Sequence, residues 1–237
     1  MFYHRKIIIQ KSLLDLKNFK KYNIVTMFKN VLDFTKKHMD FKIYKVTWIP
    51  IIIAILIYPA IKYLPEKYGY ENGILENTQL VFLVLSCIFG FCTKSHKKFF
   101  KFTALVSIIL ILREVNCGRT IFFPVPDAVN TFYSWKEIKY GWLAHPLYGL
   151  YMAGVGVYFI INKLYLDLFK YIKCVKLPVW NIVFLLIGMG IGMYSEKVID
   201  NMLLEEMTEM LFYASLMSII WLYAFNKNFK IKENENN

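Results

Sequence analysis

Six long apolar segments, separated by short polar connections, form the main pattern of this 237-residue chain. The segments cover residues 46–64, 76–93, 99–117, 143–164, 178–195 and 204–225. Each is close to the roughly 20 residues with which a helix crosses a bilayer, and none alternates apolar and polar positions as a barrel strand does. Because lipid offers no partners to free backbone groups, only helices or closed barrels can span it. The pattern predicts an all-α, polytopic membrane bundle of about six transmembrane helices within residues 46–225.

The basic residues divide the connections into two kinds. Lys and Arg are concentrated in residues 5–45, 94–101, 163–176 and 227–232, whereas residues 65–75, 118–142 and 196–203 carry Asp and Glu with fewer bases. The two kinds alternate along the chain. By the positive-inside rule, the basic set faces the cytoplasm. The sequence therefore predicts a multi-pass protein of the plasma (inner) membrane, with the N-terminus and the C-terminus inside.

The composition supports a membrane location and argues against nucleic acid as a partner. Hydrophobic residues make up 57% of the chain, above the roughly 45–50% of soluble domains, and the net charge is +12. A basic soluble chain would suggest nucleic acid, but here the bases sit in alternate connections, so the lipid bilayer is the expected partner. The first long apolar run begins 45 residues into the chain, so it is expected to be retained rather than removed as a signal peptide.

Two segments flank the predicted bundle. Residues 1–45 repeat apolar side chains at helical spacing among lysines, for example Leu13, Leu16 and Phe19. This basic amphipathic pattern suits anionic lipid headgroups at the inner surface, and a helix packed on the inner loops is the alternative. Met27 is an alternative start. Residues 226–237 are expected to form a polar cytoplasmic tail.

Small residues suggest packing rather than chemistry. Glycines at helical spacing are expected to allow close helix approach in the segments 143–164 and 178–195. They are Gly149, Gly154, Gly156, Gly188, Gly190 and Gly192, together with the small residue Ala153. The four cysteines form no C-x-x-C pair, so they indicate small apolar fillers or lone thiols rather than a disulfide or zinc framework.

The predicted topology brings many polar side chains to one level near the outer surface, while the rest of the spans is almost free of charge. The polar residues at this level are Glu71, Glu76, Gln79, Arg113, Glu114, Asn116, Arg119, His145, Glu196, Lys197, Asp200, Glu205, Glu206 and Glu209. A charge within a span usually faces the bundle interior and finds a partner. The candidate ligand-binding or structural cluster is Glu76, Gln79, Arg113, Glu114, His145, Glu206 and Glu209.

Helical spacing predicts specific partners within this set. Glu76 and Gln79 are three residues apart, as are Glu206 and Glu209, so each pair shares a helix face. Arg113 is expected to pair with Glu209 inside the bundle, with Glu76 as another candidate partner. Acids at a helix N-terminus also complement the macrodipole, and Glu205 is expected to have only this role. For Glu76, Arg113 and Glu209, a functional role and a purely structural role both remain open.

Three short motifs resemble those of a group of small bacterial multi-pass membrane proteins whose function is not established. They are E-N-G-I-L-E at residues 71–76, R-E at 113–114 and E-E-M-T-E at 205–209. They are similar to an E-x-G-x-x-E that opens one span, an R-E that ends the next and an E-x-x-E that opens the last. The resemblance covers the second to the sixth span and implies a shared outer-face acid and Arg site, without implying a reaction.

Three functions fit such a site. The leading one is binding or transport of a small solute or ion. The carboxylates, with Gln79 and Asn116, could hold a divalent cation. Arg113 would compete with a metal, however, and therefore favours a zwitterionic or proton-coupled solute. An intramembrane or interfacial enzyme acting on a lipid or peptide is the second, although the chain has no G-x-S-x-G or H-E-x-x-H motif and only His145 at this level. The third is a non-catalytic subunit or scaffold that works with a partner membrane protein.

Overall fold

The computed structural model describes residue 29 and residues 35–126 and 128–229. The chain divides into two compact units, residues 1–40 and 41–237, and each is described by itself. In the first unit, the described residues include the short strand β1 (Met39–Asp40). The amphipathic helix predicted within residues 1–45 falls mostly outside the described residues, and so do residues 230–237 of the predicted tail.

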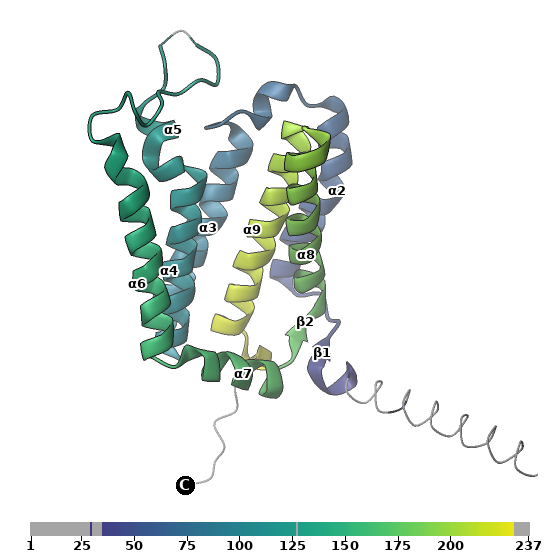
Figure 1. The fold of residues 1–237 in the computed structure, drawn as a ribbon. Helices are drawn as coiled ribbons and strands as arrows, with labels where there is room; N and C mark the ends of the chain where they lie inside the picture. The colour runs from purple at the N-terminus through teal and green to yellow at the C-terminus, as the bar shows by residue number, and fades with distance from the viewer. Residues whose placement is uncertain (1–28, 30–34, 127, 230–237) are drawn as a thin grey trace, which may run out of the picture. The chain divides into compact units, whose positions relative to one another are not determined.

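Long helices build the second unit, and they coincide with the six apolar segments of the sequence. They are α2 (Trp48–Tyr63), α3 (Ile74–Cys92), α4 (Lys97–Glu114), α6 (Ala144–Ile161), α8 (Val179–Tyr194) and α9 (Met202–Phe225). Figure 1 shows these helices running side by side, with α9 inside the bundle. Helix α9 packs against α2, α3 and α8, whereas α4 packs against α3 and α6. The prediction of an all-α helix bundle is confirmed.

Shorter elements join the long helices. The strand β2 (Leu177–Pro178) precedes α8, and the short π-helix η5 (Ser195–Ile199) follows it. The remaining short elements are the 3₁₀ turns η1 (Lys45–Thr47), η2 (Glu66–Gly69), η3 (Asn116–Gly118), η4 (Gly141–Leu143) and η6 (Lys227–Phe229), and the helices α5 (Arg119–Phe122) and α7 (Leu164–Cys174). An isolated antiparallel bridge between Pro124 and Phe132 closes part of the loop between α5 and α6.

Five helices in the described part of the chain are long and apolar enough to cross a membrane, so this is a multi-pass membrane protein. These segments are Lys45–Tyr63, Glu66–Cys92, Gly141–Ile161, Val179–Ile199 and Met202–Phe225. Helix α4 has a similar length but carries three lysines in its first turns and Arg113 and Glu114 at its end. Its charged residues, rather than its length, therefore distinguish α4 from the five helices that are apolar enough to cross a membrane.

The core of the bundle forms around α9. Met207, Leu211 and Ala214 of α9 are buried against Ile53 of α2 and Leu75 of α3. By contrast, most side chains of α6 are exposed on the bundle surface. A helix that is apolar on all sides is expected where one face meets protein and the other meets lipid. The burial pattern thus gives α9 the central position and α6 a peripheral one.

The glycines divide into two groups. A Cβ atom added to Gly188 would lie 2.8 Å from both the Phe212 nitrogen and the Thr208 oxygen, so α8 and α9 approach each other closely there. One added to Gly192 would lie 3.3 Å from Thr208 Oγ1. The prediction of close approach is wrong for the other glycines of these segments, which face open space within 4 Å: Gly149, Gly154, Gly156 and Gly190. A small residue permits helix contact, but the position of the neighbouring helix decides whether contact occurs.

The connection between α6 and α8 contains a helix that the sequence pattern does not predict. Residues 164–174, expected as part of a lysine-rich connection, form the helix α7, which lies across one end of the bundle (Figure 1). Its apolar residues Leu166 and Phe169 are exposed while Leu164 is fully buried. An amphipathic helix in this orientation suits the interface between headgroups and acyl chains.

Candidate functional site

The candidate site lies where the end of α4 and the beginnings of α3 and α9 come together. Helix α4 ends at Glu114 because Asn116, Cys117 and Gly118 have positive φ angles of 43°, 51° and 90°, which a helix does not accommodate. Helix α9 begins after Asn201, whose Oδ1 accepts a hydrogen bond of 2.9 Å from the Leu204 backbone nitrogen. These boundaries bring the last residues of α4 level with the first three turns of α9.

An ion pair joins α4 to α9. The Arg113 Nη2 atom lies 2.6 Å from Glu209 Oε1, and the Arg113 Nε atom lies 3.6 Å from Glu114 Oε1. The side chain of Arg113 is 54% exposed, that of Glu209 18% and that of Glu114 7%. The pairing of Arg113 with Glu209 is as expected from the sequence. Arg113 nevertheless lies at the edge of the site rather than in the bundle interior, because it is the second-last residue of α4 and its side chain is half exposed.

A tyrosine that the sequence reading overlooked makes a second link between α4 and α9. The Tyr213 hydroxyl donates a hydrogen bond of 2.5 Å to Glu114 Oε1. Tyr213 is fully buried and lies one turn beyond Glu209 on α9. The same carboxylate oxygen of Glu114 thus faces both the Tyr213 hydroxyl and Arg113. The spacing of four residues between Glu209 and Tyr213 was the available signal, since it puts both on one face of α9.

A buried amide links α3 to α9. The Gln79 Nε2 atom donates to the Glu206 backbone oxygen at 2.9 Å and to Glu206 Oε2 at 2.7 Å. Gln79 is fully buried, and its Oε1 atom is buried with no hydrogen-bond partner. An unsatisfied buried acceptor is unfavourable by about 1–3 kcal/mol. The geometry leaves an acceptor that is ready for a donor from a further group.

Glu76 shows the same feature one turn away on α3. Its Oε2 atom accepts a hydrogen bond from the Asn72 backbone nitrogen, and Asn72 Nδ2 donates to the Thr120 backbone oxygen of α5. Glu76 is 4% exposed, and its Oε1 atom is buried with no partner. The loop before α3 therefore fixes one oxygen of this carboxylate while the other remains unpaired.

We use the name polar cluster for Glu76, Gln79, Arg113, Glu114, Glu206, Glu209 and Tyr213. Glu206 lies within electrostatic range of the three other glutamates of this set. The cluster contains four carboxylates and one guanidinium, so its formal charge is −3 when these five groups are ionised and the Tyr213 phenol is neutral. Removing charges from water is strongly unfavourable unless they are paired. Protons or a bound cationic group must therefore offset the excess of negative charge.

Some residues that the sequence placed at this level stay outside the polar cluster. His145 is exposed at the start of α6, where its ring packs edge to face against Trp135 with 5.5 Å between centroids. Glu205 is in the first turn of α9, where an acid complements the helix dipole. Glu71 contacts the loop between α5 and α6 through its backbone nitrogen, which donates to Asn130 Oδ1 at 3.0 Å. Sequence position indicates the depth of a residue in the membrane but not its place around the bundle.

The arrangement does not match a preformed metal site. Among the residues that the structure describes, no group of three or more His, Cys, Asp or Glu side chains is placed to hold a metal ion. Arg113 also pairs with Glu209 Oε1 at 2.6 Å, and a guanidinium repels a metal cation. The polar cluster can instead accept hydrogen bonds through Glu76 and Gln79 and can take up positive charge.

Fold and site together define a polytopic helical membrane protein with an acidic polar cluster near one end of its bundle. Comparisons with protein-family models, with curated proteins and with solved structures each find no match to this chain. The resemblance to the small bacterial multi-pass proteins, drawn from the three short motifs, stays a prediction.

Proposed function

We propose that the chain crosses the plasma (inner) membrane six times, with both termini on the cytoplasmic side and α4 as the third span. In support, α4 is flanked by α3 and α6 and runs beside them (Figure 1). Its lysines lie at the end of the bundle that carries the other basic connections, as the positive-inside rule requires. On this topology the polar cluster lies on the outer side of the membrane, and α7 lies on the inner side.

The polar cluster is proposed to bind a small solute that carries a cationic group, or a monovalent cation, in exchange for protons, and to present it for transport. The observation that carries this proposal is the pair of buried acceptors without partners, Glu76 Oε1 and Gln79 Oε1. They lie on one face of α3 beside a set of carboxylates that one guanidinium cannot neutralise. An ammonium group offers three donors and a positive charge, so it would satisfy both requirements at once.

A thermal-shift experiment on the purified full chain tests this function. The probes are sodium, potassium, methylammonium and the zwitterion glycine. A probe present at 100 times its Kd stabilises the protein by about 2.7 kcal/mol. The stabilisation should be lost in Glu76→Gln and Gln79→Leu and retained in the matched control Glu205→Gln, which also removes one carboxylate from the same end. The proposal is wrong if the probes stabilise all three variants as much as they stabilise the natural chain. It is also wrong if none of the four probes stabilises the natural chain.

Proton exchange gives the proposal a second test. Binding of a cationic probe should weaken as the pH is lowered from about 7.5 to 5, because protons and the probe compete for the same carboxylates. Proteoliposomes that contain a pH-sensitive dye distinguish transport from binding. A sustained change of the internal pH on addition of the active probe indicates exchange for protons across the membrane, and an unchanged internal pH indicates binding without passage.

A further inference from the structure

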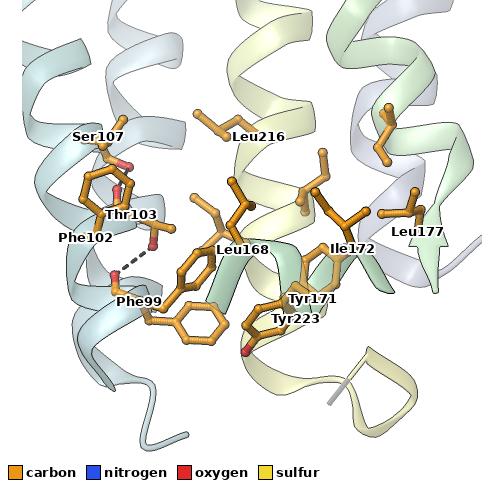
Figure 2. Close-up of a pocket in the computed structure, with 15 residues that line it drawn as sticks. Phe99, Phe102, Thr103, Ser107, Leu168, Tyr171, Ile172, Leu177, Leu216 and Tyr223 are labelled. Carbon is orange, nitrogen blue, oxygen red and sulfur yellow. Dashed lines mark hydrogen bonds between the residues drawn. The ribbon is translucent and has the colours of Figure 1, made fainter. Parts of the chain in front are cut away.

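A second site lies at the other end of the bundle, where α7 crosses it. A cavity of about 320 Å³ is lined by α4, α7 and α9, with contributions from β2 and α8. Figure 2 shows the rings of Phe99, Tyr171 and Tyr223 at its lower end, with Leu216 above them. The volume falls at the low end of the range of ligand pockets, about 300–1,000 Å³. The cavity shares no residue with the polar cluster, so the inference does not rest on the proposed solute site.

The cavity wall is almost entirely apolar, and the hydroxyls of Thr103, Ser107 and Tyr223 already have hydrogen-bond partners. The Thr103 hydroxyl donates to the Phe100 carbonyl at 2.8 Å, and the Ser107 hydroxyl donates to the Thr103 carbonyl at 3.0 Å. The Tyr223 hydroxyl donates to the Lys176 carbonyl at 3.3 Å. Burial raises the pKa of the Tyr171 phenol, so that ring is neutral. A cavity with such a wall stays dry in water and takes hydrocarbon.

The cavity is open along α7. Leu168 and Ile172 line it and are 42% and 48% exposed, so the cavity opens beside this helix. Helix α7 is amphipathic and lies across the bundle end (Figure 1). Such a helix suits the level where headgroups meet acyl chains. A hydrocarbon chain can therefore enter from the surrounding leaflet while its polar end stays at the level of α7.

The edge of the cavity carries a net positive charge. Lys170 and Lys176, both exposed, each precede a lining residue in the sequence, whereas one acid, Asp167, precedes the lining residue Leu168. Lysines near a membrane surface attract anionic lipids. We propose that the cavity binds an acyl chain of an anionic phospholipid of the bilayer, whose phosphate lies against Lys170 and Lys176.

Lipid titration of the delipidated full chain, followed by native mass spectrometry, tests this site. The probes are dioleoyl phosphatidylglycerol and dioleoyl phosphatidylcholine, which have the same chains and differ in net charge. Phosphatidylglycerol should bind up to about 30-fold more tightly, because each near-surface lysine contributes up to about fivefold. In the double variant Lys170→Gln/Lys176→Gln, the two lipids should bind equally.

Substitutions that fill the cavity test whether it binds the acyl chain of the lipid. Leu216→Trp, on α9, and Leu168→Trp, on the exposed α7, should each weaken binding of both lipids at least about tenfold. Leu168 lies outside the packed spans, so its variant is expected to keep the fold and the thermal stability of the natural chain. The control is Ile55→Trp, which adds the same ring on the exposed face of α2, outside the cavity, and should bind both lipids as the natural chain does. Equal binding of the two lipids by the natural chain, unchanged binding by a stably folded Leu168→Trp, or a preference for phosphatidylglycerol that survives loss of both lysines would overturn the proposal.

Discussion

Arg113 is expected to matter more to stability than the glutamate with which it pairs. Arg113→Gln leaves two carboxylates without their cation: Glu209, whose oxygen lies 2.6 Å from the guanidinium, and Glu114, at 3.6 Å. Glu209→Gln is milder, because Arg113 keeps Glu114 as a partner and the cluster loses one negative charge. The two partners of the same ion pair should therefore give unequal losses.

The solvent exposure of the ion pair determines how much free energy of unfolding is lost when it is broken. Breaking a fully buried pair is unfavourable by about 3–5 kcal/mol, and a surface pair contributes roughly 0.2–1 kcal/mol. Arg113 is 54% exposed while the two carboxylates are largely buried, so an intermediate value applies. We expect Arg113→Gln to lower the free energy of unfolding by about 2–3 kcal/mol and Glu209→Gln by about 1 kcal/mol.

The double variant Arg113→Gln/Glu209→Gln gives the sharpest test, because the effect of Glu209→Gln on stability should change sign. Once Arg113 is replaced, Glu209 is only a source of repulsion, so Glu209→Gln should then be neutral or stabilising. The coupling energy between the two changes should be about 1–2 kcal/mol. The measurement is reversible unfolding in mixed dodecyl sulfate micelles at pH 7.5. If Glu209→Gln has the same effect in both backgrounds, or if Glu205→Gln is as harmful as Glu209→Gln, the ion pair does not stabilise the bundle.

Three further predictions test the topology, the packing and the N-terminal segment. In a background without native cysteine, single cysteines at positions 135 and 200 should be labelled from outside intact cells, and those at positions 97 and 168 should not; labelling at position 97 or 168 would contradict the six-span topology. Gly188→Ala should lower the free energy of unfolding by about 1–3 kcal/mol, because its Cβ would meet the backbone of α9, whereas the control Gly190→Ala, which faces open space, should have little effect in the same assay. Removal of residues 1–26 should leave a folded bundle and weaken binding to anionic vesicles by at most about 1 kcal/mol for each basic residue that lay near the surface; unfolding of the truncated chain would show that the segment packs on the bundle.

Long apolar runs allowed the main helices to be located from the sequence alone. The signal is strong because a membrane span needs many apolar residues in succession, and the long helices other than α4 have them. Helix α7 was missed because its 11 residues include lysines and fall below that length. Its apolar residues, Leu164, Leu168, Tyr171 and Ile172, nevertheless recur at helical spacing, which was the signal for an amphipathic helix at the interface.

The membrane also explains which site residues the sequence could indicate. A charged side chain in an apolar run is conspicuous, and this singled out Glu76, Arg113 and Glu209. Tyr213 is not conspicuous, because a phenol in an aromatic-rich span is equally expected in the core or at the lipid surface. His145 was grouped with the cluster through its depth alone, but α6 is on the periphery of the bundle and its ring faces Trp135. The packing of the helices, which no single span encodes, decides these positions.

The polar cluster has two sides, and only one of them is complete. On the side between α4 and α9, Arg113 and Tyr213 satisfy Glu114 and Glu209, as a structural bridge between helices requires. On the side between α3 and α9, Glu76 and Gln79 each keep a buried acceptor without a partner. A bridge that served stability alone would gain by pairing these atoms or by replacing them with apolar groups. Their presence beside Glu206 therefore favours a ligand with donor groups on the α3 side, and it predicts that changes at Glu76 affect binding more than changes at Glu209 do.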